Sequence, residues 1–260
     1  MPYQLAVCAE MHYLDLPLLD RVTTIRDKGF QVEIWDFSSK NLPELAATGA
    51  TFSSMTGYLR GNFTTEEGRQ ELIKTAQLAL ESSLILNLPR LNLHGTGLGE
   101  GGFPVLAQEQ VTGYDWVKAA ETLHQLGDEA AKLGKTFILE NLNTAVDHPG
   151  TPWAKAEDTL ALVQAVDHPN VRLNLDLYHA QIGEGNLIQL IERCLPWIGE
   201  IQIADVPGRC EPGTGEIRYE AIASYLRSVD YQGVIALESY ARTSSDLALQ
   251  TFQDIFALSA

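Results

Sequence analysis

Three acidic residues of the chain stand directly after short apolar runs. Each run has the composition of a buried strand, and a hydrophobic core would reject a charge at its end. The pairs of run and acid are 137–139 with Glu140, 173–175 with Asp176, and 235–237 with Glu238. One such carboxylate alone could cap a helix or form a loop salt bridge, but three on different strands indicate a shared site.

Carboxylates that converge repel one another unless a positive group holds them. A divalent cation would do so, and Gln202, inside the apolar run 201–203, offers a neutral oxygen as a further ligand. Oxygen donors alone favour Mg²⁺ or Mn²⁺ over Zn²⁺, and such a set leaves about two positions of an octahedron for adjacent substrate oxygens. We therefore expect one divalent metal ion with these ligands: Glu140, Asp176, Gln202 and Glu238.

A site of this kind suits an α-hydroxy carbonyl compound as its small-molecule substrate. The cation would polarise the carbonyl, so that a carboxylate could remove a proton from the neighbouring carbon. The same cation would stabilise the enediolate, and return of the proton to the other carbon would complete an isomerisation. We predict that Glu140 and Glu238 carry this proton.

The elements that must position these residues follow from an alternation of short Val, Ile and Leu-rich runs with longer segments of helical periodicity. Strands are predicted at 4–9, 32–35, 51–55, 90–94, 136–140, 171–176, 201–205 and 234–238. Helices are predicted near 16–28, 42–47, 65–82, 114–133, 157–166, 187–194, 218–228 and 244–257. This regular α/β alternation favours a closed (β/α)8 TIM barrel, in which the C-terminal strand ends form the catalytic mouth.

An open doubly wound sheet is the alternative fold. It would carry a glycine-rich phosphate turn after an early strand, whereas the glycine cluster of this chain, 95–102, follows the fourth and has no helix directly downstream. The cluster is also without basic residues, so it is either a mobile lid or an ordinary connection. No linker interrupts the pattern, and we predict a single domain over residues 1–260.

Composition excludes several classes of function. The formal net charge of −16 with 18 scattered Lys and Arg residues repels nucleic acid, and no apolar run approaches the length of a membrane span. The N-terminal residues lack the basic and small-residue features of a secretory signal, so a cytoplasmic location is expected. Three cysteines without CxxC spacing suggest neither a disulfide framework nor a zinc cage.

Several motifs closely resemble the hydroxypyruvate isomerase family of xylose isomerase-like barrels. They are Asn174-Leu175-Asp176-Leu177-Tyr178-His179, residues 201–209 (Ile-Gln-Ile-Ala-Asp-Val-Pro-Gly-Arg) and residues 211–217 (Glu-Pro-Gly-Thr-Gly-Glu-Ile), with weaker support from 68–71 and 140–143. The resemblance implies the same four metal ligands, with Glu140 and Glu238 also as acid and base. It further implies that His179 hydrogen-bonds a substrate oxygen and that Arg209 clamps an anionic group.

Other positions bear on the substrate. His94 ends the predicted strand 90–94 and is either a substrate contact or a structural histidine. Glu200 stands where these isomerases commonly carry a histidine, which alters the charge near the site. The substrate expected from the resemblance is hydroxypyruvate, which is converted to tartronate semialdehyde, or a related 2-oxo sugar acid. The first three predicted strands, whose loops normally shape substrate choice, match the family poorly, so they leave the exact substrate open.

Three alternatives remain open at this point. A ketose 3-epimerase would use two glutamates on opposite faces of one carbon, although its third metal position is more often histidine than a glutamine such as Gln202. An abasic-site endonuclease of the superfamily would need clustered histidines and a basic face, whereas this chain has six histidines in all. A catalytically silent barrel would bind a ligand without turnover. The resemblance also implies a homo-oligomer.

Overall fold

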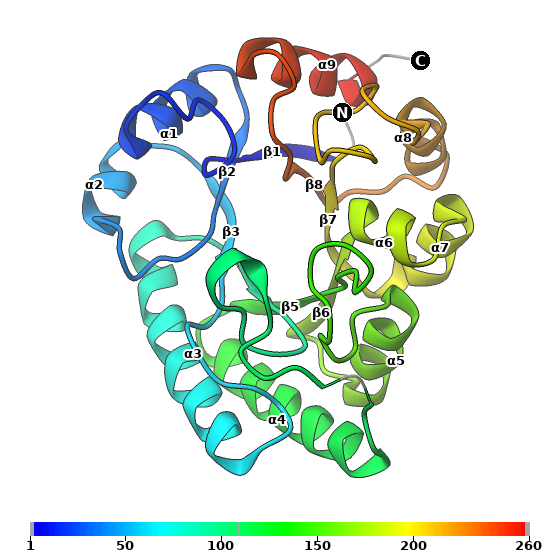
Figure 1. Ribbon diagram of the computed structural model, residues 1–260. Coiled ribbons are helices and arrows are strands. Elements are labelled where there is room, and N and C mark those ends of the chain that lie inside the picture. The colour runs from blue at the N-terminus through cyan, green and yellow to red at the C-terminus, as the bar shows by residue number, and fades with distance from the viewer. Residues whose placement is uncertain (1–2, 109, 258–260) are drawn as a thin grey trace.

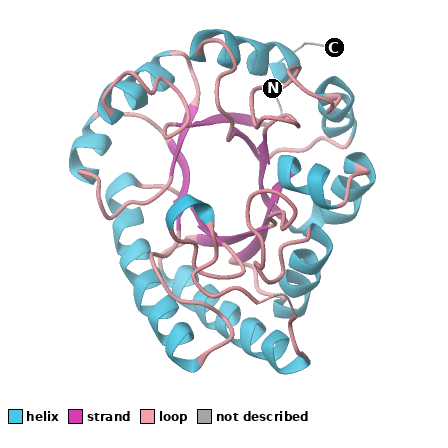
Figure 2. Ribbon diagram, in the orientation of Figure 1, coloured by secondary structure: helices cyan, strands magenta, loops and turns pink. Residues whose placement is uncertain are grey.

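The computed structural model describes residues 3–108 and 110–257, and its centre is a closed barrel of parallel strands in sequence order, β1 to β8 (Figures 1 and 2). The strands are β1 (Gln4–Cys8), β2 (Gln31–Ile34), β3 (Phe52–Thr56), β4 (Arg90–Leu93), β5 (Thr136–Glu140), β6 (Val171–Asp176), β7 (Ile198–Ile203) and β8 (Val234–Leu237). Pairing of Leu5 with Ile235 joins the first strand to the last. The predicted TIM barrel is confirmed.

Helices surround this barrel as an outer layer (Figure 2). They are α1 (Leu18–Asp27), α2 (Leu42–Ala47), α3 (Glu66–Leu86), α4 (Gly113–Lys132), α5 (Ala156–Val166), α6 (Leu177–Gly183), α7 (Leu187–Cys194), α8 (Tyr219–Ser228) and α9 (Ser245–Ala257). Each predicted helix has a counterpart, and α6 is an additional one that sequence periodicity did not predict. It begins directly after β6, where the Asp176 side chain accepts a hydrogen bond from the backbone N–H of His179 at 2.9 Å.

The core lies between the strands and the helices that cover them. Apolar residues of a parallel barrel strand are buried on both faces, which explains the continuous Val, Ile and Leu runs. On the last helix, Phe252 stacks against Phe30 with ring centroids 5.9 Å apart, and the Tyr3 hydroxyl donates to the backbone carbonyl of Phe256 at 2.7 Å. The helix α9 therefore packs against the residues that lead into β1 and β2.

The glycine-rich segment 95–102 is packed against its neighbours. A Cβ atom on Gly95 would lie 1.9 Å from the backbone oxygen of Pro152, so only glycine fits there. The N–H of Gly97 donates to the carbonyl of Gly61 at 2.9 Å. Of the two interpretations of this segment, these contacts favour a connection whose glycines permit close backbone approach.

Among the described residues, every helix is too short or too polar to cross a membrane.

Candidate active site

The C-terminal ends of the strands bring the predicted acidic residues to one mouth of the barrel. Glu140 is the last residue of β5, Asp176 is the last of β6, and Glu238 directly follows β8. All three side chains are buried, as is Gln202 on β7, which pairs in register with Asp176. A charge at the end of a barrel strand is thus removed from water, which makes its neighbours decisive for its protonation.

Glu140 and Asp176 lie beside His179, and one ligand atom from each lies within 4.8 Å of the others. His179 Nε2 is 3.9 Å from both Glu140 Oε1 and Asp176 Oδ2 and makes no hydrogen bond within the part of the chain that the structure describes. The helix α6 places this ring, because Asp176 caps the turn that carries it. The histidine predicted to contact substrate therefore faces the two carboxylates.

The neighbour Asn143 determines which ring nitrogen of His179 carries the proton. Asn143 Oδ1 accepts from the N–H groups of Val146 and Asp147, so the Nδ2 amino group is the end that faces His179 Nδ1, at 2.7 Å. An amino group only donates, so Nδ1 accepts and the neutral ring carries its proton on Nε2. Burial lowers the pKa of His179 well below its usual value, which keeps the ring neutral. His179 is thus a hydrogen-bond donor aimed at the mouth.

Burial and mutual repulsion shift the two carboxylates toward their protonated forms. Burial first and Glu238 second raise the pKa of Glu140 to about 8. Burial, Glu140 and Glu238 raise the pKa of Asp176 well above its usual range. Arg209 opposes both shifts. The three acids therefore interact across the mouth, and such a buried cluster is one that a positive ion would stabilise.

Glu238 is held by two donors. Trp35 Nε1 donates to its Oε1 at 2.8 Å, and Arg209 donates to its Oε2 at 2.6 Å. The Arg209 guanidinium also lies over the Tyr178 ring, 5.1 Å from its centroid. Burial tends to lower the pKa of Arg209, but Glu238, Asp176 and Glu140 together raise it, so the group stays cationic. Arg209, which is predicted to bind an anionic group of the substrate, therefore lies next to Glu238, one of the two predicted catalytic glutamates.

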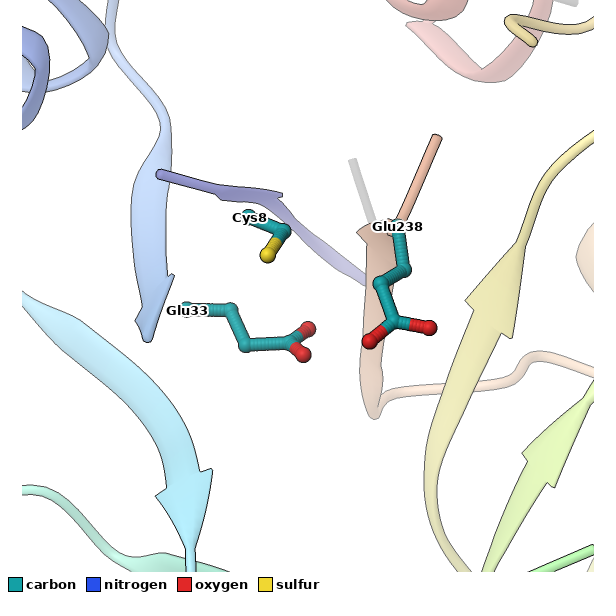
Figure 3. Close-up of side chains that lie close together, drawn as sticks. All are labelled: Cys8, Glu33 and Glu238. Atoms are coloured by element: carbon teal, nitrogen blue, oxygen red, sulfur yellow. The ribbon is translucent and has the colours of Figure 1, made fainter. Parts of the chain in front are cut away.

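Cys8 of β1 and Glu33 of β2 also lie close to Glu238 (Figure 3). Their Sγ and carboxylate oxygens lie within 4.8 Å of an oxygen of Glu238, and both residues are buried. Burial, then Glu238, raises the pKa of Glu33 well above its usual range. Sequence reasoning treated both residues as parts of core strands, and a glutamate inside an apolar run was the signal that could have identified Glu33.

Gln202 is fixed by hydrogen bonds at both ends of its amide. Its Oε1 accepts from Asn174 at 2.6 Å, and its Nε2 donates to Glu33 at 2.7 Å. The amide oxygen therefore lies on the side of β6, the strand that ends in Asp176. The role of Gln202 as a metal ligand stays a prediction. The Oε1 atom keeps one lone pair that is available to a metal ion.

His94 also reaches the site. It follows β4, and its Nε2 lies 3.2 Å from Glu140 Oε2 while Nδ1 lies 2.8 Å from the Tyr58 hydroxyl. Burial lowers the pKa of His94 to about 4, so the ring is neutral near pH 7. Asn92, two residues earlier, donates to the same oxygen of Glu140. Sequence reasoning missed Tyr58 and Asn92, because neither residue type stands out within a strand or loop.

Glu200 occupies the barrel interior below Gln202, as strand alternation predicts. It is fully buried and accepts from Arg90 at 2.5 Å and from Ser54 at 3.0 Å. These partners belong to β4 and β3, so the contacts cross the barrel. The charge of Glu200 is neutralised there, two residues before the Gln202 amide.

A closed parallel barrel with buried acids and a neutral histidine donor at its C-terminal mouth defines an enzyme site of the TIM-barrel class. Over residues 37–255 the chain matches the model of the xylose isomerase-like TIM barrel family, and it belongs to that family. This confirms the family inferred from the sequence motifs.

Individual relatives have related names. The chain is 30% identical to 2-oxo-tetronate isomerase of Pectobacterium atrosepticum over 88% of both chains. It is 32% identical to hydroxypyruvate isomerase of Escherichia coli over 50% of both chains. Among solved structures, an AP endonuclease of family 2 from Brucella melitensis has a TM-score of 0.85 and 28% identity, covering 96% of this chain and 98% of that one.

Proposed function

We propose that the protein is a metal-dependent isomerase of short sugar acids, which moves a proton between adjacent carbons of a hydroxy-carbonyl substrate. The observation that carries the proposal is the pair of buried glutamates at the mouth, Glu140 and Glu238, which are close enough for Glu238 to raise the pKa of Glu140. The names of the relatives support the same class of reaction.

The two glutamates are suited to different halves of the proton transfer. Trp35 and Arg209 both donate to Glu238, which stabilises its anion as a proton acceptor. Glu140, whose pKa is raised to about 8 in the metal-free protein, has a higher proton affinity than an ordinary glutamate and is suited to delivering a proton. We assign removal of the substrate proton to Glu238 and delivery of a different proton to the adjacent carbon to Glu140. Proton exchange with solvent restores both glutamates, and the reverse reaction exchanges their roles.

The donor set fits a divalent cation. Buried carboxylates that lie close together, and an amide oxygen with a free lone pair, are hard donors that Mg²⁺ or Mn²⁺ accepts. Glu140, Asp176, Gln202 and Glu238 would hold the ion. When bound, it would polarise the substrate carbonyl and acidify the adjacent C–H.

The remaining contacts fit a small anionic substrate. Arg209 keeps Nε without a hydrogen-bond partner among the described residues, so it has donor capacity for a carboxylate. His179 Nε2–H would donate to a substrate oxygen, and the neutral His94 would contact another. Hydroxypyruvate and 2-oxo-tetronate both combine a carboxylate, a carbonyl and a hydroxyl, and we propose this class of compound as substrate.

The proposal is tested by incubating the Mn²⁺-loaded or Mg²⁺-loaded protein with hydroxypyruvate, 2-oxo-tetronate and ketoses in D₂O, with NMR of exchange and products. Glu140→Gln and Glu238→Gln should each lower the exchange rate by about 10²–10⁴-fold. Glu211→Gln, at a buried carboxylate that accepts from the backbone of Arg242 at 2.8 Å, is the control and should retain exchange. Unchanged exchange in both glutamate variants would refute the mechanism.

The same experiment separates the alternatives. A ketose 3-epimerase would invert one carbon of a ketose without moving its carbonyl. The Brucella melitensis structure is named an AP endonuclease, which makes nuclease activity a further alternative. A net charge of −16 opposes binding to the phosphates of DNA, so we expect no binding of abasic DNA at low salt. The cytoplasmic location and the homo-oligomer stay predictions from the sequence.

A further inference from the structure

A row of three side-chain amides crosses the barrel interior beneath the mouth. Asn92 comes from β4, Asn174 from β6 and Gln202 from β7. A carboxylate accepts a hydrogen bond at each end of the row, Glu140 from Asn92 and Glu33 from Gln202. The row therefore joins β2, β4, β5, β6 and β7 through side chains alone.

The donors and acceptors along this row determine how each amide is oriented. Asn174 Nδ2 has two hydrogens, and it donates to Gln202 Oε1 at 2.6 Å and to Asn92 Oδ1 at 3.1 Å. Each outer amide thus turns its oxygen toward Asn174 and its amino group toward a carboxylate. A reversed Gln202 or Asn92 would place its amide oxygen against a carboxylate oxygen and its amino group against another amino group. With Glu33 and Glu140 accepting at the two ends, the arrangement requires a double donor at its centre.

Asn174 is fully buried, and its own Oδ1 has no hydrogen-bond partner among the described residues. An orphaned buried acceptor is destabilising, because it has lost its hydrogen bonds to water without replacement. Turning the amide over would give Oδ1 two other oxygens as neighbours, so the two donated bonds decide its orientation. The chain thus tolerates one unpaired oxygen at Asn174 and keeps both outer amides aligned.

We propose that Asn174 and Glu33 are positioning residues, which hold the Gln202 oxygen on the β6 side, next to Asp176, and hold Asn92 as a donor to Glu140. Glu33 secures the amino end of Gln202, and Asn174 secures its oxygen. The expected effect on metal binding rests on the proposed function, because the positioned groups are the proposed metal ligands Gln202 and Glu140. The direction of the row itself is independent of any reaction.

The test measures Mn²⁺ affinity by calorimetry, with folding checked by circular dichroism. Asn174→Leu, nearly equal in size but without donors, should weaken Mn²⁺ binding about 10–100-fold, the usual cost of losing a group that orients a ligand. Glu33→Leu should do the same. Glu33→Gln can still accept from Gln202, so it should restore affinity to within about threefold of wild type. Ser53→Ala, at a buried strand hydroxyl outside the row, is the control and should bind normally.

A second readout does not depend on metal. In ¹⁵N-labelled metal-free protein, Glu33→Leu should shift the side-chain amide resonances of Asn174 and Asn92, although Asn92 is three hydrogen bonds away from Glu33. Unmoved resonances, or a folded Asn174→Leu variant with wild-type Mn²⁺ affinity, would overturn the inference. Wild-type protein that binds no Mn²⁺ but shows the resonance shifts would refute the proposed function and support the direction of the row.

Discussion

Charge is the main physical problem for the individual residues of this site. Five buried carboxylates point into the barrel: Glu33, Glu140, Asp176, Glu200 and Glu238. Arg209 lies among the upper ones and lowers the pKa of Glu140 and Asp176, while pairing with Glu238. Its positive charge therefore acts on all three acids at the mouth.

Replacement of Arg209 should raise the pKa of Glu140 further. The guanidinium favours the Glu140 anion, so Arg209→Gln removes that stabilisation and the carboxyl should titrate above its present value of about 8. The measurement is a ¹³C NMR titration of the glutamate carboxyls in metal-free protein, with Glu140→Gln for assignment. Lys132→Gln, which removes an exposed cation paired with Glu129, should leave the titration unchanged. A downward movement of the midpoint in Arg209→Gln would contradict the electrostatic account.

The strands β3, β4 and β7 are tied together by one buried ion pair. Arg90 donates to Glu200 at 2.5 Å, and Ser54 donates to the other oxygen of that carboxylate. Arg90 on β4 and Glu200 on β7 come from strands that are not neighbours in the barrel, so the ion pair fills and neutralises its interior. An unpaired carboxylate in this place would be costly, because Glu200 is fully buried and a buried charge without its partner is strongly destabilising.

Breaking this ion pair should destabilise the barrel strongly. Arg90→Met leaves Glu200 buried without its cation and should lower the free energy of unfolding by about 3–5 kcal/mol, measured by urea denaturation. The double variant Arg90→Met/Glu200→Leu should recover most of the loss, because both charges are gone. As a control, Arg60→Met breaks the exposed pair with Glu71 and should cost about 1 kcal/mol or less. A double variant as unstable as Arg90→Met would show that packing, not charge, dominates.

For the whole molecule, the raised pKa values link stability to pH and to metal. A group whose pKa is raised by folding stabilises the protein fully below its unfolded value, here 4.5 for Glu140, and loses that contribution as pH rises through about 8. Asp176 and Glu33 shift in the same direction. The metal-free protein should therefore lose stability as pH rises across this window.

Mn²⁺ should oppose this loss, since it binds the deprotonated ligands of the folded protein. At a free concentration about 100 times its Kd, it should add about 2.7 kcal/mol to the free energy of unfolding. Thermal denaturation at pH 5.5 and pH 8.5, with Mn²⁺ or with EDTA, measures both effects, and the stabilisation should be larger at the higher pH. Equal melting temperatures with and without Mn²⁺ at pH 8.5 would contradict a metal bound by these acids.

The sequence by itself determined the barrel and the positions of its acids. Strand and helix periodicities are local properties of the chain, and the closure of regular strand and helix pairs follows from general rules of chain topology. Glu140, Asp176 and Glu238 could be selected because each interrupts an apolar pattern at a strand end. The helix α6 was missed, because it follows β6 without an intervening loop and its start depends on the Asp176 cap.

Only the tertiary structure decided which groups these acids meet. Trp35 and Arg209 reach Glu238 from distant parts of the chain, and Glu33 meets Gln202 across the barrel. The orientation of an amide, or the proton position on His179, follows from the donors and acceptors around it, which no local pattern encodes. Sequence therefore identified the carboxylates, whereas their protonation and the direction of the hydrogen bonds between them arise from burial and from contacts distant in sequence.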